Sequence, residues 1–284
     1  MVRVPRLRTV VVLLAMLGVV AGAVSTSGKS HRSGRAAAPR APAGERLRYH
    51  ATWNGVPVAT AELLVASASG GTVQLKGRAE TNEALDLLWR MRDSFEATVA
   101  RDPGIETDGG IRPDRFLLRQ HENERRRETT VTRDAAHGRL VGSKCKPKHP
   151  PRVASVPLGR RVHDPASLGY LLRTLPPELA TPQTYEVFTG TKTYRLTVTP
   201  AGEEKVEAIG RRWPARKLRL SLELVPTDEK PSAAEGAVQN AELWVSSGPE
   251  RLPLRLQSET FWGWVSVELI GRGARGTEIA AADR

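Results

Sequence analysis

The chain has 284 residues, with 43 Lys and Arg against 31 Asp and Glu, and a single cysteine. This length is enough for one large or two small domains, and one cysteine excludes a fold held together by internal disulfide bonds. The formal charge of +12 is gathered in residues 1–44 and 119–161, which does not indicate a folded face that binds nucleic acid.

A secretory signal peptide is predicted at the N-terminus. MVRVPRLR carries three arginines and no acid, an apolar run follows from Val10 to Val24, and Ala21-Gly22-Ala23 offers small residues for cleavage. We therefore expect an exported protein of the periplasm or cell envelope, with residues 1–23 as signal peptide. An uncleaved signal anchor is the alternative, because the apolar run is only slightly short for a membrane span.

Residues 24–43 are rich in Ser, Gly, Ala, Pro and Arg and have little to bury, so they are predicted to be a disordered linker. From residue 44 the pattern changes to an alternation with period two, which is typical of antiparallel strands. Residues 44–284 are accordingly predicted to form one all-β domain, an antiparallel meander of roughly a dozen strands curved into a half-barrel or barrel-like sandwich.

Hairpins and loops punctuate this pattern. Asn54-Gly55 favours a tight hairpin turn, Thr189-Gly190 indicates another, and a third hairpin is expected with a polar tip over residues 122–127. Residues 227–240 are predicted to be a loop, and KPKHPPR, residues 146–152, is expected to be an extended loop because of its three prolines.

One amphipathic helix is predicted in the middle of the chain, over residues 164–175 of HDPASLGYLLRTLP. Asp164 is a good N-cap, Pro165 suits the first helical position, and the prolines at 176 and 177 end the helix. Four leucines follow the spacing of one buried helical face: Leu168, Leu171, Leu172 and Leu175. So short a helix is marginal alone, and we expect it to lie on the concave face of the sheet.

The final strand has apolar residues on both faces. Trp262 and Trp264 share one face, and Val265, Val267 and Leu269 share the other. Core packing explains this pattern, and an aromatic-lined cavity for an apolar or lipid-like ligand is the second interpretation. The residues hypothesised to line such a cavity are Leu168, Leu171, Leu172, Leu175, Trp244, Trp262 and Trp264.

A basic strip within residues 119–161 is the other candidate surface. It is hypothesised to bind anionic headgroups or glycans, with a solvated hairpin and loop as the alternative, through Arg125, Arg126, Arg127, Lys144, Lys146 and Lys148. Cys145 is expected to be an incidental unpaired thiol, or to form a bridge to another chain.

No catalytic or cofactor motif is found in the sequence. The His and Cys residues lack metal-ligand spacing, no Gly-x-Ser-x-Gly elbow occurs, and no glycine-rich phosphate loop is present, so neither metal nor cofactor is predicted. Carboxylates that converge from distant strands to form an acid-base pair cannot be recognised in a sequence. The candidates for such a catalytic pair are Glu45, Asp93, Asp164 and Glu268.

Four segments resemble, in order and spacing, a bacterial envelope family known as domain of unknown function 3108. They are GERLRYHATWNGVPVATAEL, LLWRMRDSFEATVA, HDPASLGYLLRTLP and AELWVSSGPERLPLRLQSETFWGWVSVELIG. The resemblance runs over nearly all of residues 44–271 and implies an exported envelope protein with no established catalytic residues. The strand-rich pattern is also similar to the open-barrel carriers that shuttle lipoproteins between bacterial membranes.

These features together predict a non-enzymatic envelope protein that binds an apolar or lipid-like ligand, or an envelope partner, in its concave face. Two alternatives stay open at this point. One is a hydrolase or polysaccharide-modifying enzyme with carboxylates from distant strands, and the other is a structural scaffold without a cavity.

Overall fold

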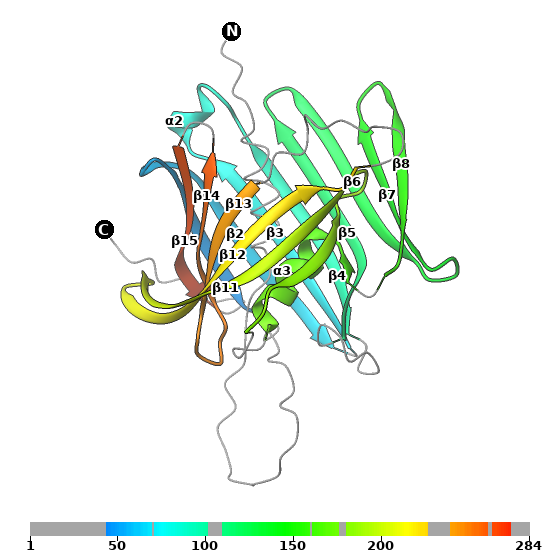
Figure 1. Ribbon diagram of the computed structural model, residues 1–284. Coiled ribbons are helices and arrows are strands. Elements are labelled where there is room, and N and C mark those ends of the chain that lie inside the picture. The colour runs from blue at the N-terminus through cyan, green and yellow to red at the C-terminus, as the bar shows by residue number, and fades with distance from the viewer. Residues whose placement is uncertain are drawn as a thin grey trace, which may run out of the picture.

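The computed structural model describes residues 44–69, 71–101, 110–159, 161–175, 180–226, 239–260 and 263–273 (Figure 1). Within these ranges the chain forms one sheet of fifteen strands and two helices. The predicted all-β fold with a central helix is therefore confirmed. The predicted signal peptide, the linker and most of the loop 227–240 lie outside the described residues.

The strands are β1 (Arg46–Trp53), β2 (Val56–Ser69), β3 (Thr72–Thr81), β4 (Arg92–Arg101), β5 (Ile111–Glu122), β6 (Arg125–Asp134), β7 (Arg139–Lys146), β8 (His149–Pro157), β9 (Val162–His163), β10 (Gln183–Phe188), β11 (Thr193–Ala208), β12 (Arg211–Leu224), β13 (Gln239–Ser246), β14 (Pro253–Thr260) and β15 (Gly263–Gly273). The helices are α2 (Glu83–Asp86) and α3 (Pro165–Thr174).

The sheet is a meander in which the first and last strands of the chain are neighbours in the middle of the strand order. Its order is β8-β7-β6-β5-β4-β3-β2-β1-β15-β14-β13-β12-β11-β10-β9. All neighbours are antiparallel except β9 and β10, which are parallel. The first strand pairs with the last, with Trp53 opposite Val265 and Leu47 opposite Arg272. Pairing of β1 with β15 joins the two halves of the meander into one continuous sheet.

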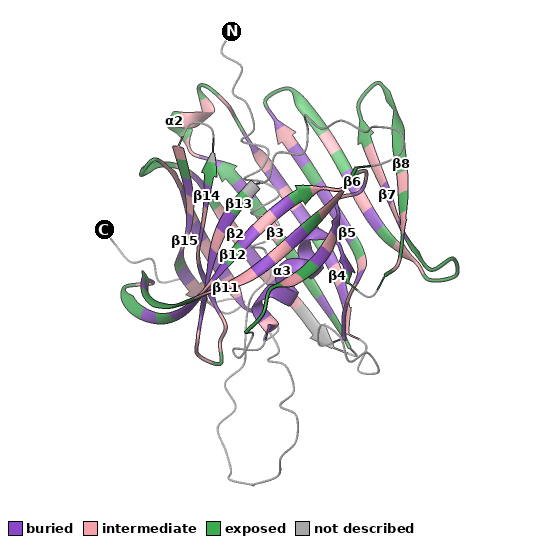
Figure 2. Cartoon of the chain, in the orientation of Figure 1, coloured by how far each residue is buried: buried purple, intermediate pink, exposed green. Residues whose placement is uncertain are grey.

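The first hairpin forms where the sequence predicts it. Asn54 and Gly55 adopt positive φ values of 49° and 81°, the geometry that a two-residue hairpin turn requires. Leu47, Tyr49 and Ala51 on β1 are buried on one face. Figure 2 shows the same alternation of buried and exposed residues along the other strands, so each strand turns one side to the core.

The sheet is rolled, but its two edge strands, β8 and β9, are not hydrogen-bonded to each other. Instead, the β10–β11 turn packs against the inner side of β6 and β7. A Cβ atom added to Gly142 on β7 would lie 2.0 Å from the carbonyl oxygen of Gly190 in that turn, and one added to Gly190 would lie 2.5 Å from Thr129 Cγ2 on β6. Close packing of the Gly190 backbone against Gly142 and Thr129 therefore joins these two parts of the roll, and the β7–β8 hairpin projects past this contact (Figure 1).

The prediction of an extended loop over residues 146–152 is wrong. Residues 149–157 form β8, and Lys146 pairs with His149 across the turn to β7. Pro150 and Pro151 fit here because β8 is an edge strand, where a missing N–H group need not break a ladder. The prolines also blunt an edge that would otherwise invite pairing with another chain.

Candidate functional site

Helix α3 starts from a complete N-terminal cap inside the protein. The Asp164 carboxylate accepts hydrogen bonds from the backbone N–H groups of Ala166 and Ser167, at 2.8 and 2.9 Å. The Ser167 hydroxyl in turn accepts one from the Asp164 N–H at 3.1 Å. Because Asp164 is fully buried, these bonds satisfy helix-end donors that water cannot reach. Burial raises the pKa of the Asp164 carboxyl to about 6 against the opposing effect of these hydrogen bonds.

Helix α3 lies in the concave face of the sheet. Nine of its ten residues are buried, and it packs between β4 and β5 on one side and β9 and β10 on the other. Its leucines join the one core cluster of the described residues, with exposed fractions of 0% for Leu168, 1% for Leu171, 1% for Leu172 and 5% for Leu175. The structure thus places the four predicted leucines together, in contact with protein.

The C-terminal end of α3 is fixed by a buried ionic cluster. Arg173 Nη1 lies 3.5 Å from Glu45 Oε2 just before β1, and Glu45 Oε1 accepts from Arg272 Nε on β15 at 2.8 Å. Arg173 also donates from Nε to the Glu250 carbonyl oxygen at 3.1 Å. One side chain of the helix therefore joins both the start of β1 and the β13–β14 connection.

Burial governs the titration of this cluster. Arg173 is 2% exposed and Glu45 is 4% exposed. Desolvation raises the pKa of Glu45 to about 7, although Arg173 and Arg272 act to lower it. Desolvation also lowers the pKa of Arg173 to about 9 against the attraction of Glu45. Burial likewise raises the pKa of Tyr49, whose hydroxyl donates to the Pro253 carbonyl oxygen at 3.2 Å.

Trp244 on β13 is buried and belongs to the core cluster. Its ring lies near the cations of Lys217 and Arg255, at cation-to-ring distances of 4.9 and 5.8 Å. Its assignment to a ligand-binding cavity stays a prediction.

The last strand separates its two apolar faces as the sequence indicates. Val265, Val267 and Leu269 are buried, whereas Trp264 on the other face is 48% exposed. Trp264 thus belongs to the outer surface rather than to the concave face. Trp262 lies outside the described residues.

The four carboxylates named for an enzyme lie in separate places. Asp164 caps the start of α3 and Glu45 meets its end, about 15 Å apart for a helix of ten residues. Asp93 on β4 accepts from the His121 backbone N–H at 3.0 Å, and burial raises its pKa to about 6. Glu268 pairs with Arg255 on the outer face of β15, at 3.0 Å.

The basic strip is only partly a surface. Arg125, Arg126, Lys146 and Lys148 are exposed at the β5–β6 and β7–β8 turns, and Lys144 is half-buried. Arg127 is not part of the exposed strip: its side chain is 9% exposed and lies 3.0 Å from Glu122. Arg127 pairs with the buried carboxylate of Glu122, and the two arginines before it, at the start of β6, are exposed.

An outer cleft of about 330 Å³ lies over β1, β2 and β3, lined among others by Arg46, Glu62, Lys76 and Arg78. Glu62 pairs with Arg46 at 3.2 Å and with Arg78 at 2.8 Å. These pairs form a cross-strand ladder of opposite charges, which stabilises the sheet surface modestly.

Within the described ranges, no three His, Cys, Asp or Glu side chains lie close enough together to hold a metal ion. Cys145 on β7 is an exposed free thiol. None of the helices in the described part of the chain is long and apolar enough to cross a membrane.

Comparison with known proteins places this architecture in a family. A family model described as "Protein of unknown function (DUF3108)" matches residues 48–270. No curated protein matches the chain.

Solved structures share the fold at low sequence identity. A β-barrel-like protein of domain of unknown function DUF1849 from Brucella abortus is 9% identical, with a TM-score of 0.53 over 81% of this chain and 97% of that one. A protein of YmcC-like fold from Bacteroides fragilis is 8% identical, with a TM-score of 0.31 over 80% of this chain and 94% of that one. The first likeness supports a β-barrel-like fold, and the second is too weak to add to it.

Proposed function

The chain belongs to the DUF3108 family of proteins of unknown function, and we propose that it is an exported envelope protein that binds an apolar or lipid-like ligand in the concave face of its sheet. One observation carries the proposal: the apolar concave face of the sheet holds a single short helix, α3, which packs against β4, β5, β9 and β10. The leucines of α3 occupy the volume that an acyl chain would take. Concave, mostly apolar sites are where small ligands bind in proteins.

The way the roll is closed gives such a ligand a route. The β10–β11 turn meets β6 and β7 through Gly190 and Gly142, and the edge strands share no ladder. Opening this contact breaks packing but no strand pairing. A helix of ten residues is marginal by itself. In the open state, with the β10–β11 turn away from β6 and β7, a ligand can replace the contacts of the α3 leucines. Because it binds this state more tightly, it shifts α3 out of the concave face.

The alternative of a hydrolase gains nothing from the geometry. Glu45, Asp93, Asp164 and Glu268 are distributed over both faces of the sheet and both ends of α3. Paired acid and base groups would have to converge within reach of one substrate bond. The arrangement of these four carboxylates therefore gives no support to hydrolysis.

Native mass spectrometry of the protein purified gently from envelope fractions tests the proposal. The expected result is a mass above that of the polypeptide, with a lipid released by organic extraction. Delipidated protein should then bind a fluorescent fatty acid. A protein that carries no extractable lipid and does not bind the fatty acid would instead be a scaffold.

Hydrogen exchange locates the ligand. Added fatty acid should speed exchange of the α3 amides, because the ligand displaces the helix, and should leave the amides of β12 and β13 protected. Leu171→Gln, in the concave face, should weaken binding, whereas Ile270→Gln makes a comparable change at a 37% exposed site on β15 and should not. Equal effects of the two substitutions would place the ligand elsewhere.

Export is tested separately by N-terminal sequencing of the mature protein. Cleavage after Ala23 is the expected result, because the small residues of Ala21-Gly22-Ala23 follow the apolar run. A protein that retains Met1 in the membrane fraction would show a signal anchor instead.

A further inference from the structure

The β1–β2, β3–β4 and β14–β15 connections lie at one end of the sheet (Figure 1), and four exposed apolar side chains lie in these connections or at the adjoining strand ends. We call them the apolar rim: Val56, Leu87, Leu88 and Trp264, with exposed fractions of 62%, 88%, 80% and 48%. Among the described residues, the other exposed large apolar side chains are Val153 and Ile270. Single exposed apolar residues are ordinary, whereas a cluster at one place marks a surface that binds something.

Hydrogen bonds join these three connections into one surface. The Asn54 backbone N–H donates to the Trp264 carbonyl oxygen at 2.8 Å, and the Trp264 N–H donates to Asn54 Oδ1 at 2.8 Å. The Asn82 backbone N–H donates to the Val58 carbonyl oxygen at 3.0 Å. The Asn82 side-chain amide donates to the Pro57 carbonyl oxygen at 2.7 Å. The apolar rim is therefore continuous across three neighbouring hairpin ends.

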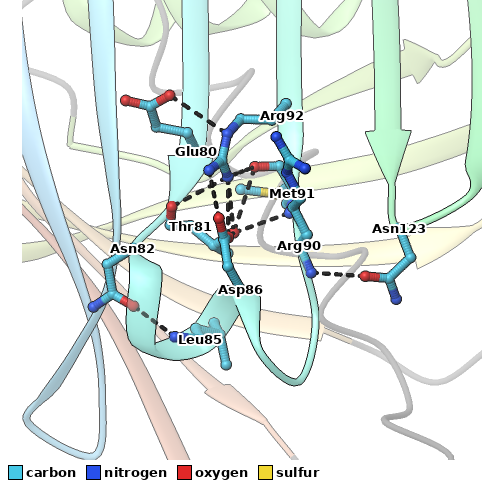
Figure 3. Close-up of polar contacts among 9 residues, drawn as sticks. All are labelled: Glu80, Thr81, Asn82, Leu85, Asp86, Arg90, Met91, Arg92 and Asn123. Carbon is cyan, nitrogen blue, oxygen red and sulfur yellow. Dashed lines mark hydrogen bonds and ion pairs between the residues drawn. The ribbon is translucent and has the colours of Figure 1, made fainter.

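A network of polar contacts fixes the β3–β4 connection (Figure 3), which carries the exposed Leu87 and Leu88. Asn82 caps α2 by accepting from the Leu85 N–H at 2.9 Å. Asp86 accepts from both guanidinium ends of Arg92, one of them at 3.1 Å. The short connection is thus fixed to the base of β4. Two adjacent leucines exposed on a well-anchored turn forgo burial that would favour folding, so their exposure calls for a binding role.

Cations adjoin the apolar rim at the same end of the sheet. Arg90 and Asn123 exchange two hydrogen bonds of 2.8 Å, which tie the β3–β4 connection to the β5–β6 turn. Residues 82–91, 123–126 and 146–149 carry five Lys or Arg, namely Arg90, Arg125, Arg126, Lys146 and Lys148, all of them exposed. The acids of these segments are Glu83, Asp86 and Glu124, and Asp86 is neutralised by Arg92.

We propose that this end of the protein docks on an anionic phospholipid membrane, with the apolar rim between the headgroups and the cations against their phosphates. Charge complementarity identifies the partner, because the cations lie beside the apolar tips at the same end of the sheet, and a flat acidic protein surface would leave those tips in water. Stable membrane attachment needs two weak signals together, an apolar insertion and a basic patch. Trp264 suits the interface between water and acyl chains, since its ring is apolar with one polar N–H.

Vesicle co-sedimentation of the full-length mature protein tests the proposal. Vesicles of phosphatidylethanolamine and phosphatidylglycerol in a three-to-one ratio should bind the protein, and vesicles of phosphatidylcholine should bind it at least about tenfold more weakly. Leu87→Asp with Leu88→Asp should lower binding to the anionic vesicles at least about tenfold. Arg125→Glu with Arg126→Glu should lower it by a factor of about five or more per residue, with a weaker dependence on salt.

Val153→Asp is the matched control, because Val153 is 68% exposed on β8 and away from the apolar rim. It should bind vesicles like the unchanged protein. All substituted sites are exposed, so thermal unfolding should be nearly unchanged and loss of fold would not explain a loss of binding.

Three results would overturn the proposal: no binding to the anionic vesicles, unchanged binding by the leucine double variant, or an equal loss in Val153→Asp. Capture of a protein partner that needs Leu87 and Leu88, without any vesicle binding, falls under the first. The inference does not rest on the concave face, and lipid extracted from the leucine variant should equal that of the unchanged protein.

Discussion

The guanidinium group of Arg173 near the end of α3 lies 3.5 Å from the carboxylate of Glu45 at the start of the sheet, and both side chains are almost fully buried. Arg272 shares the same carboxylate from β15. Removing two charges from water is costly, so the cluster is weak evidence for stability. The position of the cluster is informative. It fixes where α3 lies in the rolled sheet, because it ties the C-terminal end of the helix to the start of β1 and to β15.

Arg173→Met should destabilise the protein strongly. The substitution keeps the long apolar stem but leaves the buried Glu45 without Arg173 and paired with Arg272. Breaking a buried pair from one side costs about 3 kcal/mol. Urea unfolding at pH 7.5 measures the loss. Addition of Glu45→Gln to Arg173→Met should recover part of it, since no uncompensated carboxylate then remains; strictly additive losses would mean that the two side chains do not interact.

Stability should fall as the pH rises from 5 to 7.5. The pKa of Glu45 is raised from an ordinary value of 4.5 to about 7, so the folded state binds more protons than the unfolded state between these values. Unfolding then becomes easier with rising pH, by about 2 kcal/mol from this group. Asp93 and Asp164, whose pKa values are each raised to about 6, act in the same direction at the lower end of the window.

Glu45→Gln isolates the contribution of Glu45. Urea titrations at pH 5, 6, 7 and 7.5 should show a shallower decline for this variant, because its amide does not titrate, while the decline from Asp93 and Asp164 persists. Parallel pH profiles of the two proteins would show that Glu45 is ionised throughout this range.

Local rules of sequence predict much of this fold. The turn at Asn54-Gly55 and the cap at Asp164 depend on neighbouring residues, and both appear where the sequence places them. The pairing of β8 with β7 is local, but its position at the edge depends on the order of the whole sheet, and only at an edge are the prolines of residues 146–152 compatible with a strand.

The functional surfaces were harder to predict, because they combine distant segments. Arg173 follows Leu171 and Leu172 in the sequence, and an arginine at this position would ordinarily be expected in solvent. It is buried only because α3 is enclosed on all sides and Glu45, 128 residues earlier, meets it. Leu87 and Leu88 belong to a short connection between strands, and the sequence alone does not show that they form a surface cluster. That cluster depends on Trp264, 176 residues later, lying at the same end of the sheet.

Asp164→Ala should destabilise α3 by about 2 kcal/mol, at the upper end for an N-cap because the freed donors are buried. Asp164→Asn keeps a side-chain oxygen that accepts from the Ala166 and Ser167 N–H groups, so it should cost less than about 1 kcal/mol. Thermal unfolding compares the two. Equal losses would mean that the carboxylate charge, rather than the cap geometry, holds the start of the helix.

The contact that closes the roll can be tested with two glycines of similar backbone conformation. Gly190 has φ +92°, and a Cβ atom there would lie 2.5 Å from Thr129 Cγ2. Gly202 has φ +96°, and a Cβ atom there would meet no neighbouring side chain or backbone within 4 Å. Gly202→Ala thus measures backbone strain alone, about 1 kcal/mol, and Gly190→Ala should cost about 3 kcal/mol because overpacking adds to the strain.

Gly190→Ala should also change where the protein opens. Amides of β10 should exchange faster with solvent, since the turn can no longer seat on β6 and β7, while amides of β1 and β15 keep their protection because the pairing between them is untouched. If the two glycine variants lost equal stability and exchanged alike, the β10–β11 turn would not be what holds the rolled sheet together, and the route proposed for the ligand would have to lie elsewhere.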